Sequence, residues 1–212
     1  CKSKNLNEFL TNLGDSEYKE VLSGVSDEIQ NVFSYEMKLE NYYYSKLWKL
    51  KDKHLKGKDY ELIEEIIGQR IDIENILWIF RNKKYYEIDS SIIYTYVIPI
   101  NYKLTKKQLL SLVQANSIAE FMLHIDKTYY KGMFDDLVEM TNEKMSIDTQ
   151  VNAYLYKKTS ELARNNPFSI ASIVNYLTAK EIEISDIISI IEGVRYKLDP
   201  KRLEQYVIKY KL

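Results

Sequence analysis

Two polar side chains, Asp72 and Asn75, stand among isoleucines and leucines in residues 71–80. Because they are three positions apart, a helix would place both on one face. A second, similar segment carries Glu183 and Asp186 at the matching positions. Polar atoms in apolar surroundings need hydrogen-bond partners, so we expect these side chains to tie neighbouring helices together. The alternative interpretation is that they bind a partner protein.

The sequence holds no pattern typical of catalysis or ligand binding. Its two histidines, His54 and His124, have no metal-ligand spacing with each other or with Cys1, the single cysteine. The six glycines are far apart, so neither GxGxxG nor GxxxxGK[ST] occurs. Acidic neighbours such as Asp135 and Asp136 would diverge by about 100° on a helix and would not converge on a substrate. We therefore expect no catalytic, cofactor-binding or metal-binding site.

The charge balance argues against a nucleic-acid partner. The 212 residues include 30 Lys and Arg against 31 Asp and Glu, for a formal net charge of -1. A nucleic-acid surface needs a clustered excess of positive charge. The 19 tyrosines are better explained by amphipathic packing between helices than by stacking on bases. An RNA-binding helical protein is a third alternative, and the charge balance argues against it.

The composition favours a globular helical fold over a strand-rich fold or membrane spans. Only 6 Gly and 3 Pro in 212 residues favour long helices over a strand-rich fold with many turns. The most apolar stretch, residues 92–100, is interrupted by Pro99 and is too short to span a bilayer. Because the chain begins with Cys1, we expect it to be a fragment whose natural N-terminus lies upstream.

An internal repeat organises the chain. Residues 71–98 resemble residues 182–208, with an offset of 111 positions before Glu87 and 110 after it. Isoleucines and aromatic residues recur along this alignment, and the offset extends upstream to Tyr18 and Tyr129. We infer two copies of one helical unit, residues 1–104 and 105–212.

Helix boundaries follow from capping residues. Ser26 is expected to cap a long helix that ends near Lys56, and Asp59 to cap the next one. Gly68 lies inside that second helix. Because glycine destabilises a helix interior relative to alanine, its presence there predicts close packing against a neighbour. Further N-caps are expected at Asp89, Thr105, Ser169 and Asp199.

Two segments carry a resemblance to a known family. Residues 71–86 resemble a stretch of the C subunit of bacterial and archaeal V-type (V/A-type) ATPases, whose eukaryotic counterpart is the d subunit. The matching positions are Asp72, Asn75, Ile76, Arg81 and Lys83. Residues 166–193 resemble the C-terminal signature of that family. The matching positions there are Pro167, Tyr176, Leu177, Lys180, Glu181 and Glu183.

The resemblance covers essentially the whole chain, through the order and spacing of its motifs. It implies an all-helical fold of three related units in a pseudo-threefold funnel, of which this chain would supply the second and third. One departure is Pro99, which is followed by Ile100 where the family often has glycine. That difference concerns the shape of one turn.

The function implied by the resemblance is mechanical. Such a protein couples the proteolipid rotor ring of the membrane sector to the central shaft of the soluble sector, and so ATP hydrolysis or synthesis to H⁺ or Na⁺ transport. It would act peripherally at the cytoplasmic face of the membrane, without a cofactor. Our candidates for partner binding are Asp72, Asn75, Arg81, Lys83, Lys180, Glu181 and Glu183. The alternative function is a helical-repeat adaptor that binds other proteins.

Overall fold

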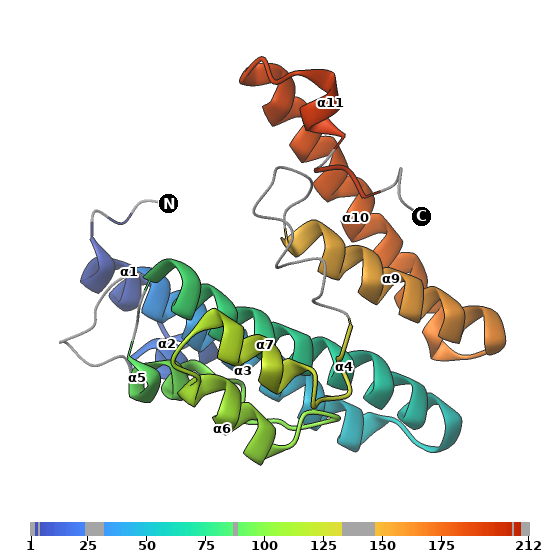
Figure 1. Cartoon of the computed structure of the whole chain (residues 1–212), viewed down its shortest axis with the longest axis horizontal. Coiled ribbons are helices and arrows are strands. Elements are labelled where there is room, and N and C mark those ends of the chain that lie inside the picture. The colour runs from blue at the N-terminus through green and yellow to red at the C-terminus, as the bar shows by residue number, and fades with distance from the viewer. Residues whose placement is uncertain are drawn as a thin grey trace.

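The structure, a computed structural model, describes residue 3 and residues 5–23, 32–86, 89–132, 147–204 and 206–208. Within these ranges every regular element is a helix, which confirms the predicted all-α class. The predicted cap Ser26 and the acidic pair Asp135 and Asp136 lie outside the described residues. Figure 1 shows a body of packed helices from which a long C-terminal helix rises.

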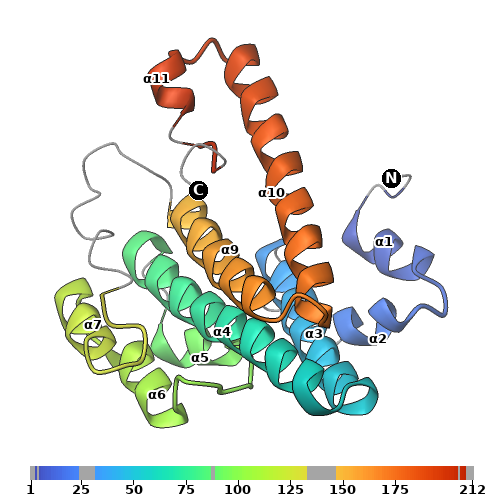
Figure 2. The same ribbon diagram turned by 90° about the vertical axis from the view of Figure 1, so that its right-hand side faces the viewer.

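The N-terminal part contains two short helices and a long hairpin. The four helices are α1 (Leu6–Asn12), α2 (Glu17–Ser23), α3 (Val32–His54) and α4 (Gly57–Arg81). α3 and α4 run antiparallel and are joined by Leu55 and Lys56 (Figure 2). The carboxylate of Glu17 holds α2 against α3, because it accepts hydrogen bonds from Lys46 at 2.5 and 2.7 Å and from Tyr42 at 2.8 Å.

A buried lysine fixes the end of this hairpin. The side chain of Lys51 on α3 is 1% exposed, and its ammonium donates to Asp52 at 2.9 Å, Tyr60 at 2.8 Å and Glu64 at 3.0 Å. The same ammonium lies 4.0 Å from the ring centroids of Trp48 and Tyr60. Burial lowers the pKa of Lys51, but these hydrogen bonds outweigh burial and raise it overall.

The expected cap of α4 at Asp59 is wrong. The N-cap is Lys56, and Gly57 begins the helix with a φ of +57°, which favours glycine. Asp59 lies in the first turn, where a carboxylate suits the helix dipole. Its Oδ1 instead accepts the backbone N–H of Ile170 at 3.0 Å, and so ties α4 to a helix far along the chain.

Shorter elements follow α4 and pack against it. They are the π-helix η2 (Asn82–Tyr86) and the α-helices α5 (Ser90–Tyr96), α6 (Lys106–Gln114) and α7 (Ile118–Ile125). The predicted cap Asp89 is confirmed, since its side chain accepts from the N–H of Ser91. Thr105 is confirmed as well, and with Gln108 it forms a capping box.

A second long hairpin forms the C-terminal part. It consists of α9 (Ile147–Asn165) and α10 (Ile170–Arg195), and the short α11 (Pro200–Leu203) follows (Figure 2). Ser169 and Asp199 cap α10 and α11 as predicted. α10 passes Gly193, near which it was expected to end, by two residues. Both hairpin helices contact α4.

The largest hydrophobic core of the described residues is built around α4. It joins side chains from α4 and α5 with side chains from α6, α7 and α9; its fully buried members include Ile73, Ile76, Phe80, Ile93, Leu112 and Phe121. Gly68 on α4 makes the predicted close approach: a Cβ there would lie 2.4 Å from Cγ of the Tyr102 ring. The connection after α5 therefore lies directly on α4.

Candidate interaction surfaces

Asp72 is the centre of a buried hydrogen-bond cluster. The residue is fully buried in the middle of α4. Its carboxylate accepts the backbone N–H groups of Tyr102 at 3.2 Å, Lys103 at 2.6 Å and Leu104 at 2.8 Å. The hydroxyl of Tyr130 donates to it as well, at 2.9 Å. This one side chain therefore fixes the connection before α6 and the turn after α7 to α4.

Burial sets the electrostatics of this cluster. Loss of hydration raises the pKa of Asp72 above its ordinary value, and the four donors limit that rise. Burial and the neighbouring Asp72 carboxylate also raise the pKa of Tyr130, so its hydroxyl stays protonated and donates. The sequence predicted that Asp72 needs partners, but no local pattern indicated that Tyr130, 58 residues away, is one of them.

Asn75 makes a second buried contact one turn further along α4. Its amide nitrogen donates to the carbonyl oxygen of Ile98 at 3.1 Å, and its Oδ1 accepts the N–H of Ile98 at 2.8 Å. On α10, buried Asp186 accepts the N–H of Ile208 at 2.8 Å. Asp186 and Ile208 are the positions that the sequence alignment matches to Asn75 and Ile98. Both polar side chains thus hold a non-helical segment against a long helix.

Arg81 and Lys83 lie together where α4 passes into η2. The Lys83 ammonium donates to the carbonyl oxygen of Ala115 at 2.6 Å, and burial lowers the pKa of this lysine. The guanidinium of Arg81 lies 5.8 Å from the ring centroid of Trp78. Lys83 therefore helps to hold the end of α6, while both residues remain partly accessible.

The other three predicted residues are on α10. Lys180 and Glu183 form an ion pair of 2.6 Å on one face, with 51% and 46% of their side chains exposed. The pair raises the pKa of Lys180. Glu181 is exposed and borders a hollow of about 160 Å³ between α4, α9 and α10, which Arg70 also lines. Of the seven candidates, these three are the most accessible to another molecule, and Asp72 and Asn75 the least.

An apolar face of α10 was not predicted from the sequence. Six side chains recur at helical spacing and are each between 50% and 62% exposed: Ile173, Leu177, Ile184, Ile187, Ile188 and Ile191. We call this set the α10 stripe. Several exposed apolar side chains on one helix face are typical of an interaction site in a soluble protein, and Lys180, three residues after Leu177, lies on the same face. Residues 170–195 are apolar on more than one face, but that pattern alone does not indicate which face stays exposed.

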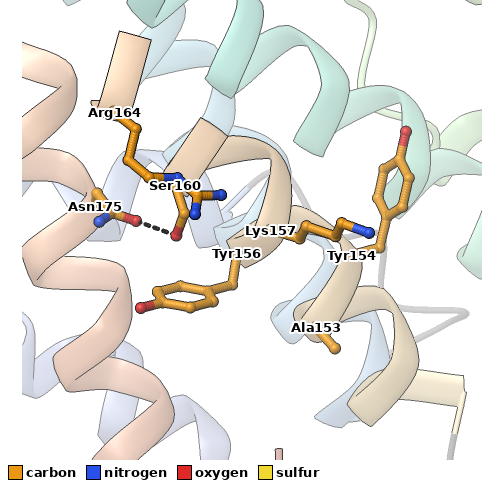
Figure 3. A pocket seen from close by; sticks show the side chains of 7 residues that line it. All are labelled: Ala153, Tyr154, Tyr156, Lys157, Ser160, Arg164 and Asn175. Atoms are coloured by element: carbon orange, nitrogen blue, oxygen red, sulfur yellow. Dashed lines mark hydrogen bonds between the residues drawn. The ribbon is translucent and has the colours of Figure 1, made fainter. Parts of the chain in front are cut away.

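A separate groove lies between α9 and α10. Its volume is about 600 Å³, and its lining comes from Ala153, Tyr154, Tyr156, Lys157, Ser160, Arg164 and Asn175 (Figure 3). Ser160 donates to Asn175 Oδ1 at 2.7 Å and so bridges the two helices. The cations Lys157 and Arg164 on α9 give the groove a positive character.

Within the described ranges, no three His, Cys, Asp or Glu side chains gather closely enough to hold a metal ion. In that part of the chain, none of the helices combines the length and apolar character that crossing a membrane requires.

Comparison with known proteins gives one consistent result. Residues 1–206 match the family model described as ATP synthase (C/AC39) subunit. The chain is similar to the C subunit of the A-type ATP synthase of Methanocaldococcus jannaschii, with 24% identity over 211 residues, or 97% of this chain and 52% of that protein. Similar proteins of the same name occur in Pyrococcus horikoshii, 25% identical over 97% of this chain and 55% of the relative, and in Desulfurococcus, 27% identical over the same shares. The chain spans about half the length of the curated relatives that it matches.

Proposed function

Because the chain belongs to the ATP synthase (C/AC39) subunit family, we propose that it is part of a non-catalytic central-rotor subunit. This part of the rotor couples the central shaft to the membrane rotor ring, and thereby ATP hydrolysis or synthesis to H⁺ or Na⁺ transport. The observation that carries the proposal is the family match over residues 1–206, which spans nearly the whole chain.

The way in which the helices are fastened supports a force-transmitting role. Asp72, Asn75 and Lys51 each join separate elements through several hydrogen bonds made in buried surroundings. Fully satisfied buried networks make a fold rigid and specify one arrangement. A force-transmitting protein needs such rigidity, since torque is lost wherever helices can slide past one another.

The two-unit organisation, residues 1–104 and 105–212, is part of this proposal. It is supported by the hydrogen bonds from Asn75 to Ile98 and from Ile208 to Asp186, which occur at positions matched by the repeat. These two units, out of three in the full-length protein, would form part of a pseudo-threefold funnel. The large core contains side chains from both halves, so the units would share a packed boundary.

The proposed partners are the proteolipid ring of the membrane sector and the central-shaft subunits of the soluble sector. The protein would lie peripherally at the cytoplasmic face, as part of the ATPase complex, with no cofactor and no nucleic-acid partner. Lys180, Glu181 and Glu183 are the best-placed candidates for partner contacts, because they lie on an accessible part of α10.

A copurification experiment tests the proposal. The natural protein that carries this chain is immobilised and offered detergent-solubilised membranes without nucleotide. We expect proteolipid and shaft subunits to be retained, and we expect the purified protein by itself to hydrolyse no ATP. Retention of neither, or ATP turnover that persists through purification, would overturn the proposal.

A helical-repeat adaptor is the second candidate function. The cationic groove between α9 and α10 favours it, because Lys157 and Arg164 would attract an acidic helix or peptide of a soluble client. The same copurification separates the two functions. An adaptor retains a soluble client without proteolipid, and its binding weakens when Lys157 and Arg164 are replaced by glutamine.

A further inference from the structure

The turns of the two long hairpins lie together at one end of the molecule. Both turns are at the right-hand end of Figure 1, the side that faces the viewer in Figure 2. Asp59, in the first turn of α4, accepts the backbone N–H of Ile170, the first residue of α10, at 3.0 Å. One turn deeper, Leu62 packs with Ala171. The two turns therefore form one surface, which we call the paired tip; it consists of residues 53–58 and 164–169.

The paired tip carries cations and no acidic residue. Its two segments have the sequences KHLKGK and RNNPFS, which contain four cationic residues and no Asp or Glu. Lys58 pairs with Glu61 on α4, at 3.2 Å. The other three, Lys53, Lys56 and Arg164, are exposed, and none of them forms an ion pair with another described residue. Their charge is therefore available to another molecule.

The acidic side chains that border the paired tip belong to the helices behind it and are already bonded. Asp59 accepts from α10 as described above, and Asp52 accepts hydrogen bonds from Lys51 at 2.9 Å and from Tyr60 at 3.0 Å. Because groups of their own chain hold these two carboxylates, the carboxylates do not pair with the cations of the tip. The tip therefore has a local excess of positive charge, although the whole sequence has a formal net charge of -1.

A completely exposed aromatic side chain accompanies these cations. Phe168 follows Pro167 in the turn between α9 and α10, and its whole ring is open to solvent. Water is an unfavourable environment for a phenyl ring, whereas the boundary between lipid headgroups and acyl chains accepts aromatic rings. Cationic side chains beside an apolar one are typical of surfaces that bind a membrane without crossing it.

We propose that the paired tip binds the anionic headgroups of a lipid bilayer. Lys53, Lys56 and Arg164 lie over the lipid phosphates, and Phe168 enters the headgroup layer. A projecting tip with separate, flexible cations suits a flat and fluid surface, whereas a protein partner requires a matching shape. The choice of a membrane as the occupant rests on the proposed function, which places the protein beside the membrane rotor ring.

Vesicle binding tests the proposal. The natural protein that carries this chain is mixed with vesicles of phosphatidylcholine alone, or of phosphatidylcholine with about one quarter phosphatidylglycerol, and cosedimentation measures the bound fraction. We expect binding to the anionic vesicles only, and we expect it to fall as salt is added. Such vesicles contain neither proteolipid nor shaft subunits, so an absence of binding overturns this inference and leaves the proposed function intact. Binding by a protein that copurifies with neither partner supports the lipid surface and removes the coupling role.

Charge variants locate the binding surface. The triple variant Lys53→Gln, Lys56→Gln, Arg164→Gln should bind anionic vesicles more weakly by roughly a factor of ten or more, because each cation near an anionic surface adds to the attraction. A matched control loses the same charge at the start of α6 and should bind as the parent does. Its substitutions, all at exposed lysines, are Lys103→Gln, Lys106→Gln and Lys107→Gln.

Two results with these variants would overturn the inference. Equal losses in the tip variant and in its control would mean that net charge alone decides vesicle binding. If the tip variant bound vesicles as the parent does but retained less proteolipid or fewer shaft subunits in copurification, the paired tip would be a surface for an acidic protein.

Substitutions of Phe168 test the aromatic contribution separately. Phe168→Ala should weaken binding to anionic vesicles by roughly a factor of ten, and Phe168→Trp should restore it, because an indole ring also suits the headgroup layer. The side chain is completely exposed, so neither change should alter the thermal midpoint measured by circular dichroism. Binding by Phe168→Ala that equals that of the parent would show that the ring does not enter the bilayer and would overturn that part of the inference.

Discussion

Asn75 is bonded through both ends of its amide to the backbone of a single residue, Ile98, at 3.1 and 2.8 Å. Such paired hydrogen bonding can be made only by a side chain that carries both a donor and an acceptor at this spacing. In the matched contact on α10, a carboxylate oxygen of Asp186 accepts the N–H of Ile208. The two contacts hold comparable segments with different chemistry, which allows them to be tested against each other.

Replacing Asn75 by alanine should destabilise the fold by about 1–3 kcal/mol, because the buried N–H of Ile98 loses its acceptor, whereas the carbonyl of Ile98 keeps the N–H of Ile100. The free energy of unfolding from urea denaturation measures this. The matched variant is Asp186→Asn, which keeps an oxygen for the N–H of Ile208 and should change stability by less than about 1 kcal/mol. A loss for Asn75→Ala no larger than that of Asp186→Asn would contradict the prediction.

Gly68→Ala should also destabilise the fold, although alanine favours a helix by about 1 kcal/mol. The new Cβ would meet Cγ of Tyr102 at 2.4 Å, close to the backbone of that residue, where the ring has little freedom to move. Overpacking of this kind costs about 1–3 kcal/mol, and thermal unfolding monitored by circular dichroism measures it.

Gly193→Ala is the matched control for this substitution. Its Cβ would meet the flexible end of Leu203, which can turn away. We expect its thermal midpoint to fall less than that of Gly68→Ala. Equal or larger loss at Gly193 would mean that side-chain freedom does not decide the outcome.

The elements that the sequence predicted well are those set by local chemistry. Asp89, Thr105, Ser169 and Asp199 cap the helices that follow them, because an N-cap depends on residues within one turn. Asp59 has the same local signal, yet its carboxylate accepts the backbone N–H of Ile170 at the N-terminus of α10. That partner is decided by how two distant hairpins cross, and a capping rule contains no such information.

The candidate residues Asp72 and Asn75 were also predictable only in the aspects that local sequence decides. An aspartate and an asparagine in an apolar helix need hydrogen-bond partners from neighbouring segments, and the structure places both side chains in the interior. Which groups satisfy them depends on the path of the chain after α5, as Tyr130 illustrates for Asp72. The α10 stripe was missed because a stripe of isoleucine has the same pattern whether another helix covers it or not.

Lys51→Met should destabilise the fold by about 1–2 kcal/mol, since it removes three charge-assisted hydrogen bonds and leaves Asp52 and Glu64 without their cation. These carboxylates are 52% and 33% exposed, so water screens part of the loss. Urea denaturation of both proteins measures the difference in the free energy of unfolding.

The difference in the free energy of unfolding between the parent protein and Lys51→Met should depend on pH in a defined direction. The pKa of Lys51 is raised above its ordinary 10.5, so its contribution is complete below that pH and is lost as pH rises through the folded value. The hydrogen bond from Lys51 lowers the pKa of Asp52 below 3.8, so that contribution is present above 3.8 and is lost as pH falls through the lower, folded value. A difference that grew on acidification below 3.8 would contradict this assignment.

Lys180 and Glu181 should matter for assembly and not for folding. Both are exposed on α10, and an exposed ion pair such as that of Lys180 with Glu183 contributes little to stability. We therefore expect the double variant Lys180→Ala, Glu181→Ala to keep the thermal midpoint of the parent while it retains less of the proteolipid and the shaft proteins in copurification. Glu192→Ala, another exposed change on the same helix, is the control and should retain both partners. If the double variant bound its partners as well as the control does, these two charged side chains of α10 would have no part in the assembly, and the contacts would have to be sought at Arg81 and Lys83.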